Sequence, residues 1–143
     1  QCILGMEEKE YVATSFMAFE KGHPLVKEFL NLYEHLSFLD EKGKIIAGTN
    51  VAKLTKMLKE KGFVQENHYQ ELENGIQIYP KEFFSPYDYI NCHYNITENS
   101  YCVHHFAVSW MSKKEKVKKG IKKRIVKILG PEKMNGIREK LKR

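Results

Sequence analysis

The adjacent pair His104 and His105 is the feature of this sequence best suited to chemistry. In a neutral imidazole, one ring nitrogen has a lone pair that can bind a divalent cation such as manganese. The other nitrogen carries a proton and can donate a hydrogen bond. The pair lies in an apolar run, residues 101 to 108, which is followed by Ser109 and by Trp110, the only tryptophan. The serine hydroxyl and the indole N–H can donate hydrogen bonds to an anionic oxygen. The segment therefore predicts a site for a metal ion or a phosphate.

The composition of residues 101 to 108 predicts a β-strand, in which neighbouring side chains point to opposite faces. We therefore expect at most one of the two imidazoles to face a given site. A structural role explains the bare pair as well. In that interpretation one histidine is half-buried and hydrogen-bonded, and the other lies on the surface.

A second candidate site is the turn Gly48-Thr49-Asn50, which precedes an expected helix. In the structural interpretation, Thr49 or Asn50 caps the helix. In the functional one, free N–H groups at the helix N-terminus approach a polyhydroxyl or phosphate ligand. The sequence leaves both open.

These residues must be positioned by a small number of secondary-structure elements. Apolar patterns predict helices over residues 22 to 39 and 50 to 61, and strands over 2 to 6, 10 to 14 and 76 to 80. The first helix is expected to have a buried apolar stripe, which comprises Leu25, Phe29, Leu32, Tyr33 and Leu36. Residues 81 to 100 form an aromatic stretch without a regular pattern, and loops of that length are usually functional. Strands and helices alternate but are too few for a doubly wound sheet. The sequence therefore predicts a mixed α/β class with a short mixed sheet.

The charge is divided unevenly along the 143 residues. Residues 1 to 111 carry a net charge of −5, whereas residues 112 to 143 carry 14 basic and 3 acidic side chains, a net charge of +11. The basic tail predicts two helices broken by Gly130 and Pro131. Nucleic acid is a poor partner for this tail, because it has no aromatic residue for stacking and only three arginines. An anionic membrane surface fits better. In a third interpretation, the apolar stripe of the tail packs onto residues 1 to 111, which we call the body.

Length and cysteine content limit the remaining classes. A chain of this size holds one modest domain. Cys2, Cys92 and Cys102 are scattered and odd in number, which favours a reducing compartment over a disulfide framework, and no histidine pair has structural-zinc spacing. The acidic start lacks the pattern of a signal peptide. Because the chain begins without methionine inside an apolar run, we expect that an N-terminal part is missing.

The order of several segments resembles a family of sugar-transferring enzymes with an Asp-x-Asp motif. This is glycosyltransferase family 32, with bacterial capsular-polysaccharide transferases and yeast-type initiating α-mannosyltransferases. The segments are ILGMEE, VATSFMAFEKGHPLVKEFLNLYE, GTNVAKLTKML, IQIYPKEFFSP and NITENSYCVHHFAVSW. The resemblance covers residues 2 to 112, and its best marker is the pairing of IYPKEFFSP with HHFAVSW.

The resemblance implies the C-terminal portion of an A-type nucleotide-sugar transferase fold over residues 1 to 111. It also implies a divalent cation, usually manganese, that bridges the donor diphosphate. By this resemblance His104 or His105 lies near the metal and the diphosphate, with Ser109 and Trp110 near the phosphates. Thr49 and Asn50 match a stretch near the sugar and the acceptor, although Asn50 stands where the family has glycine.

The sequence departs from the family at the metal site, because the Asp-x-Asp motif is absent and the only aspartates, Asp40 and Asp88, are isolated. The motif is expected upstream of Ile3, so this chain alone should be inactive. We expect an enzyme fragment that uses a nucleotide-sugar donor and a lipid-linked or oligosaccharide acceptor in capsular polysaccharide synthesis. It would lie in the cytoplasm, peripheral at the inner membrane face. The alternative is a non-catalytic module whose tail binds anionic membrane or nucleic acid.

Overall fold

The chain folds as two compact units, which are described separately. The computed structural model describes residues 1–143 except 9, 35, 45, 47, 107–111 and 142–143. The first unit is Gln1–Ser85 and the second is Pro86–Arg143. The structure is mixed α/β, as the sequence predicts. The sequence predicts a different division, into a catalytic part over residues 1 to 111 and a basic tail over residues 112 to 143. That functional division stays a prediction.

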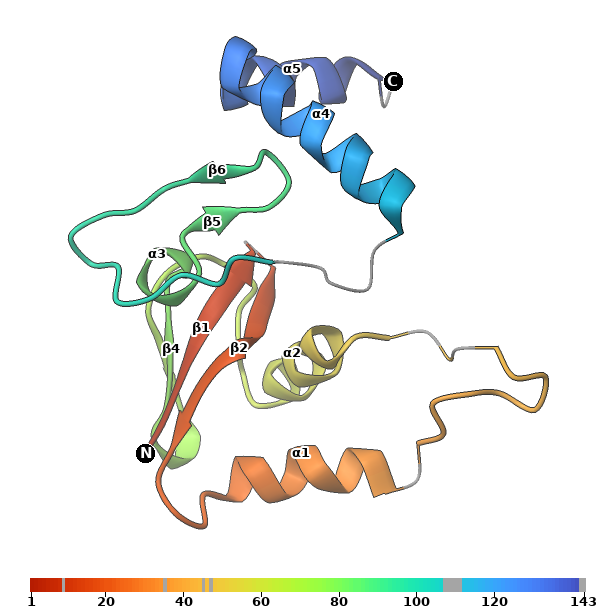
Figure 1. The fold of residues 1–143 in the computed structure, drawn as a ribbon. Coiled ribbons are helices and arrows are strands. Elements are labelled where there is room, and N and C mark those ends of the chain that lie inside the picture. The colour runs from red at the N-terminus through yellow and green to blue at the C-terminus, as the bar shows by residue number, and fades with distance from the viewer. Residues whose placement is uncertain (9, 35, 45, 47, 107–111, 142–143) are drawn as a thin grey trace. The chain divides into compact units, whose positions relative to one another are not determined.

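The first unit is built on a four-stranded mixed sheet with the order β2-β1-β4-β3 (Figure 1). Its strands are β1 (Cys2–Glu8), β2 (Tyr11–Phe19), β3 (Gln70–Leu72) and β4 (Ile76–Tyr79). β1 is antiparallel to β2 and parallel to β4, and β3 is antiparallel to β4. The short 3-10 helix η1 (Glu73–Gly75) links β3 to β4. The three strands predicted within this unit are confirmed.

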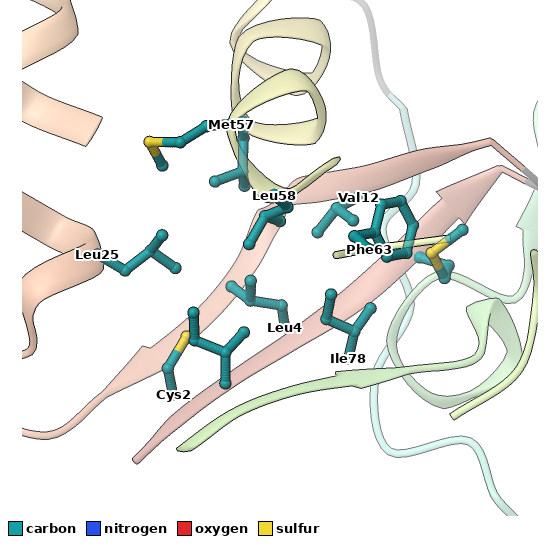
Figure 2. Close-up of a cluster of buried hydrophobic side chains, with 11 residues drawn as sticks. Cys2, Leu4, Val12, Leu25, Met57, Leu58, Phe63 and Ile78 are labelled. Carbon is teal, nitrogen blue, oxygen red and sulfur yellow. The ribbon is translucent and has the colours of Figure 1, made fainter. Parts of the chain in front are cut away.

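The hydrophobic core lies between one face of this sheet and two helices, α1 (Pro24–Glu34) and α2 (Asn50–Glu60). Cys2, Leu4 and Met6 alternate along β1 and are fully buried on that face. Figure 2 shows side chains from α1, α2 and the sheet converging in one cluster. The cluster comprises Cys2, Leu4, Met6, Val12, Leu25, Leu54, Met57, Leu58, Phe63, Ile76 and Ile78.

α1 begins at Pro24 because His23 completes its first turn. The Nδ1 atom of His23 accepts a hydrogen bond from the backbone N–H of Leu25 at 3.2 Å, and its Nε2 lies 3.0 Å from the carbonyl oxygen of Asn74. Leu25 is buried, but Leu32 and Leu36 of the predicted apolar stripe are exposed. The helix ends at Glu34, so the predicted extension to residue 39 is wrong. Few buried contacts remain there to stabilise further turns.

α2 agrees with its prediction to within one residue. Leu54 and Leu58 are buried, and the helix ends before Gly62, whose φ of 95° is the left-handed conformation of a helix stop. The side chain of Thr55 joins α2 to the sheet, because its Oγ1 accepts a hydrogen bond from the backbone N–H of Val12 at 2.9 Å. Both residues are buried.

The opposite face of the sheet carries the short helix α3 (Lys81–Phe84). Its Phe84 ring stacks on Phe16 with ring centroids 3.8 Å apart. Gly5 lies beneath this pair, because a Cβ atom at that position would be 2.7 Å from Cδ2 of Phe84. Glycine in the middle of β1 therefore allows α3 to approach the sheet.

The second unit begins with a short antiparallel pair, β5 (Tyr87–Asp88) and β6 (His93–Tyr94). The predicted strand over residues 101 to 108 is wrong for residues 101 to 106, which form no strand. Phe106 has a φ of 47°, a left-handed conformation that a strand cannot contain. Residues 107 and 108 lie outside the described part of the chain.

The basic tail forms the two predicted helices, α4 (Lys113–Leu129) and α5 (Pro131–Leu141), which contact each other. Ser112 and Glu115 start α4 with a capping box. Gly130 ends it with a φ of 82°, and its N–H donates to the carbonyl oxygen of Val126 at 2.8 Å. Among the described residues, no helix has the length and apolar character needed to cross a membrane.

Candidate functional site

The histidine pair belongs to a group of aromatic side chains in the second unit. We call this group the histidine cluster; it comprises Tyr87, Tyr89, Tyr94, His104, His105 and Phe106. The β5–β6 pair contributes Tyr87 and Tyr94, and the segment that follows β6 contributes both histidines and Phe106. Two stretches separated by about ten residues thus build one aromatic surface around the imidazoles.

His105 is oriented by Tyr94. The hydroxyl oxygen of Tyr94 lies 3.1 Å from Nδ1 of His105, and the two rings meet edge to face. A partner on one imidazole nitrogen fixes the ring and determines the tautomer. If the tyrosine donates, Nε2 carries the proton and can donate to a phosphate oxygen. If Nδ1 donates to the tyrosine, Nε2 has a free lone pair for a cation. Nε2 is thus the nitrogen available to a ligand.

His104 packs against a hydrocarbon surface instead. Its ring meets Phe106 edge to face, with centroids 4.2 Å apart, although the residue remains exposed to solvent overall. Desolvation by these neighbours, followed by the proximity of His105, lowers the pKa of His104 below its ordinary value of 6.5. The lowered pKa favours the neutral form of His104.

The backbone at Phe106 is strained, and its neighbours hold it in place. A φ of 47° is uncommon for a bulky residue, and such conformations persist where surrounding contacts fix them. Here the ring of Tyr89 stacks on Phe106 at 5.3 Å, and Nζ of Lys119 in α4 donates to the carbonyl oxygen of Phe106 at 2.9 Å. The turn after the histidines is thus tied to both the β5–β6 region and the tail helix.

The two residues of β5, Tyr87 and Asp88, have structural roles. Tyr87 is almost fully buried, and burial, followed by a hydrogen bond with Cys92, raises its pKa to about 12. The carboxylate of Asp88 accepts hydrogen bonds from the backbone and side-chain nitrogens of Asn91 at 2.8 and 2.7 Å. The nearest carboxylate along β5 therefore stabilises the turn between β5 and β6. In the part of the chain that the structure describes, no three His, Cys, Asp or Glu side chains are grouped as a metal site.

The predicted donors that follow the histidine pair cannot be placed beside it. Ser109 and Trp110 lie outside the described residues. Their role toward the phosphates, and that of either histidine toward a metal, stay predictions. The expectation that the two imidazoles point to opposite faces of a strand is wrong, because residues 104 and 105 are in no strand. The rings differ by their partners instead.

The Gly48-Thr49-Asn50 turn belongs to the first unit, and the structure confirms its capping role. Thr49 Oγ1 accepts a hydrogen bond from the N–H of Ala52 at 3.2 Å, and the Asn50 side chain accepts one from the Tyr33 hydroxyl at 2.7 Å. Nζ of Lys53 donates to the carbonyl oxygen of Gly48 at 2.8 Å. Binding of a sugar or an acceptor by Thr49 and Asn50 stays a prediction.

Two residues around this turn were missed by the sequence reasoning. Tyr33 orients Asn50, and Lys53 lies 5.7 Å from the centroid of the Tyr33 ring, within the range of a cation–π contact. Periodicity assigns Tyr33 to the buried stripe of α1. No local pattern indicates that its hydroxyl reaches the start of α2, since the two positions are 17 residues apart.

Two hollows flank α2 in the first unit. One, of about 220 Å³, lies between α1 and α2 and is lined by Leu32, Leu36, Lys53, Lys56, Met57 and Glu60. The other, of about 460 Å³, is lined by Tyr11, Ala52, Thr55, Lys56, Lys59, Glu60 and Gln65. Among the described residues, neither Thr49, Asn50 nor a histidine lines these hollows. Both are open surface depressions rather than enclosed pockets.

Comparison of the chain with known protein families, with curated proteins and with solved structures finds no match. Functional interpretation therefore rests on the residues themselves and on the order of the sequence motifs.

Proposed function

We propose that residues 1 to 111 form the C-terminal part of the catalytic domain of a nucleotide-sugar-dependent glycosyltransferase with an A-type fold, which extends a bacterial surface polysaccharide. The sequence resemblance motivates this proposal. The structural observation that supports it is the histidine cluster, in which two adjacent exposed imidazoles are each fixed by an aromatic neighbour beside a strained turn. Strained backbone conformations that the surrounding contacts hold in place cluster at functional sites.

In this proposal, His105 contacts the donor diphosphate through Nε2. Transfer of the sugar leaves negative charge on the departing nucleoside diphosphate, and hydrogen-bond donors placed in advance lower the energy of that state. Tyr94 acts as a positioning residue, because it holds Nδ1 of His105 at 3.1 Å. The hydroxyl of Ser109 and the indole N–H of Trp110 are proposed as further donors to the same phosphates.

His104 has a different role in the proposal. Since its pKa is lowered, it presents an uncharged ring at neutral pH. Its contact with Phe106 shapes the turn that carries His105. We therefore expect His104 to support the site more than to bind the diphosphate.

A complete divalent-cation site does not fit the described residues. A hard cation such as manganese or magnesium prefers several oxygen ligands, and the described residues contain no suitable group. One of the imidazoles can supply a single ligand. We propose that an Asp-x-Asp motif outside this chain, expected upstream of Ile3, supplies the carboxylates.

The acceptor side of the proposal involves the first unit. Thr49 and Asn50 are proposed to lie near the sugar and a lipid-linked or oligosaccharide acceptor. Capping does not prevent this role, because a capping hydroxyl retains a donor proton. The enzyme is proposed to be cytoplasmic and to work at the inner membrane face, where lipid-linked acceptors are found.

Single replacements in the enzyme that includes the proposed Asp-x-Asp segment test the proposal. We expect His105→Ala to lower kcat about a hundredfold, the usual cost of losing one such donor. Tyr94→Phe should lower it about tenfold by releasing the ring, a typical effect of losing an orienting partner. His104→Ala should cost only a few-fold. Equal losses from the two histidine variants, with native circular dichroism, would argue against the proposed roles.

A separate measurement distinguishes the enzyme from the non-catalytic alternative. Calorimetric titration of the intact protein with nucleotide sugars should show binding that depends on the divalent cation. If no nucleotide sugar binds while the tail still binds an anionic surface in a salt-sensitive way, the chain is better described as a docking module.

A further inference from the structure

Helix α4 exposes five of its large apolar side chains to solvent. Val117, Ile121 and Ile125 recur every fourth residue, and Ile128 and Leu129 continue the same face. We call these five residues the α4 stripe. Their exposed fractions are between 40% and 81%. A continuous row of large apolar side chains in water is unfavourable, and it usually marks a surface that binds something.

The contacts that α4 makes within its own unit use the other side of the helix. Val126 is buried, with 4% exposure, and Lys119 is the residue whose Nζ reaches the carbonyl oxygen of Phe106. At about 100° per residue, Val126 lies roughly opposite Val117 and Ile128 on the helix. Within the second unit, the buried contacts of α4 therefore lie away from the α4 stripe. The third interpretation of the tail, in which its apolar stripe packs onto residues 1 to 111, stays a prediction.

The charge around the stripe identifies the kind of surface that fits it. α4 contains nine lysine and arginine residues and one acidic residue, Glu115. Lys118 and Arg124 lie at the edges of the stripe by helical spacing. A second copy would bring two rows of like charge together, which is unfavourable. Nucleic acid would match the charge but offer no apolar surface for five aliphatic side chains.

We propose that α4 lies flat in the interface of an anionic lipid bilayer, with the α4 stripe inserted among the acyl chains and its lysines at the headgroups. Such a surface supplies both apolar contact and negative charge. Lysine stems can extend along the apolar boundary while their ammonium groups stay in water. This inference rests on α4 alone and holds whether or not the chain belongs to a glycosyltransferase.

The test is co-sedimentation of the 143-residue chain with lipid vesicles. Vesicles with phosphatidylglycerol should bind the chain, and vesicles of phosphatidylcholine alone should bind it at least about tenfold more weakly, because each lysine near an anionic surface contributes about fivefold. Two variants separate the contributions. Ile121→Gln with Ile128→Gln should lower binding about tenfold or more by removing inserted area. Lys118→Gln with Lys122→Gln should lower it comparably and weaken its salt dependence.

Phe38→Gln is the matched control, because Phe38 is an exposed apolar residue of the first unit, and it should leave binding unchanged. Circular dichroism of each variant shows whether α4 still forms, and sedimentation velocity reports self-association. Absence of binding by the unchanged chain would overturn the proposal, as would equal binding by the double isoleucine variant. Dimers that disappear in that variant would identify a second copy as the occupant instead. Tighter binding to a DNA duplex than to the vesicles would overturn it in favour of nucleic acid.

Discussion

His105 and His104 are neighbours in sequence but differ in chemistry, because one contacts a hydroxyl and the other a phenyl ring. Sequence reasoning expects a difference between them through strand alternation. The structure gives another reason for the difference, because Tyr94 contacts His105 whereas Phe106 contacts His104. A bare His-His dipeptide cannot reveal which ring will be oriented, because the orienting hydroxyl comes from β6.

The titration of His104 is the first prediction at this scale. Its folded-state pKa is lowered, so the unfolded chain binds the proton first as the pH falls. Stability should therefore decrease as the pH falls from the ordinary value of 6.5 toward the lowered folded value, and then level off. Because the residue is largely exposed, we expect a small effect. NMR titration of its ring protons should give a midpoint below 6.5, and His105→Gln should raise that midpoint. A midpoint at or above 6.5 in the unchanged chain would show that desolvation is not the controlling effect.

Gly5 provides a second prediction. Gly5→Ala would place a Cβ atom 2.7 Å from the Phe84 ring, which is held by stacking on Phe16. We expect a loss of about 2 kcal/mol in the free energy of unfolding, the usual cost of overpacking. Urea denaturation measures it. Gly120→Ala on α4 is the control, because nothing lies within 4 Å of its added Cβ. That variant should stabilise the helix by about 1 kcal/mol. Equal behaviour of the two variants would mean that α3 does not pack on β1 as described.

At the scale of elements, α2, α4 and α5 were the most predictable parts of the chain. Local signals define them: Gly62 and Gly130 stop α2 and α4, and Pro131 opens α5. The expected strand over residues 101 to 108 does not form at residues 101 to 106, because apolar composition cannot show whether a partner strand exists. The conformation of Phe106 depends on Tyr89 and Lys119, which are distant in sequence. Tertiary contacts of this kind override local propensity.

The attachment of α2 to the sheet gives a prediction at this scale. Thr55→Val keeps the shape of the side chain but leaves the buried N–H of Val12 without its 2.9 Å acceptor. An unsatisfied buried donor costs about 1–3 kcal/mol, and urea denaturation should show a loss in that range. Thr55→Ser keeps the hydroxyl and should lose only about 1 kcal/mol, from the missing methyl group. A valine variant that loses clearly less than about 1 kcal/mol would contradict the role of this hydrogen bond.

The start of α4 gives a pH-dependent prediction. Hydrogen bonds from the Ser112 side chain and backbone lower the pKa of Glu115 below its ordinary value of 4.5. The capping contribution should therefore be fully present above pH 4.5 and be lost as the pH falls through the lowered value. Circular dichroism should show α4 helicity decreasing over that acid range. Ser112→Ala should reduce helicity at neutral pH and remove this acid transition. An unchanged transition in the variant would assign it to another carboxylate.

At the scale of the whole molecule, charge and chemistry are separated along the chain. The acidic body carries the proposed sugar-transfer residues, and the net charge of +11 lies beyond residue 111. Composition alone shows this division, because it needs no knowledge of packing. The exposure of the α4 stripe could not be predicted, since a sequence gives the apolar face of a helix but not the side on which its neighbours lie.

The central claim is that His105 meets the diphosphate of a nucleotide sugar, and NMR of the intact enzyme tests it most directly. The histidine ring resonances are followed while a nucleoside diphosphate is added with magnesium. The account predicts a saturable shift of the His105 ring protons and a smaller shift for His104. The ring of His23, buried at the start of α1 and bonded to the backbone, serves as the unmoved reference. Saturation of the enzyme by the nucleotide without any shift at His105 would contradict the account.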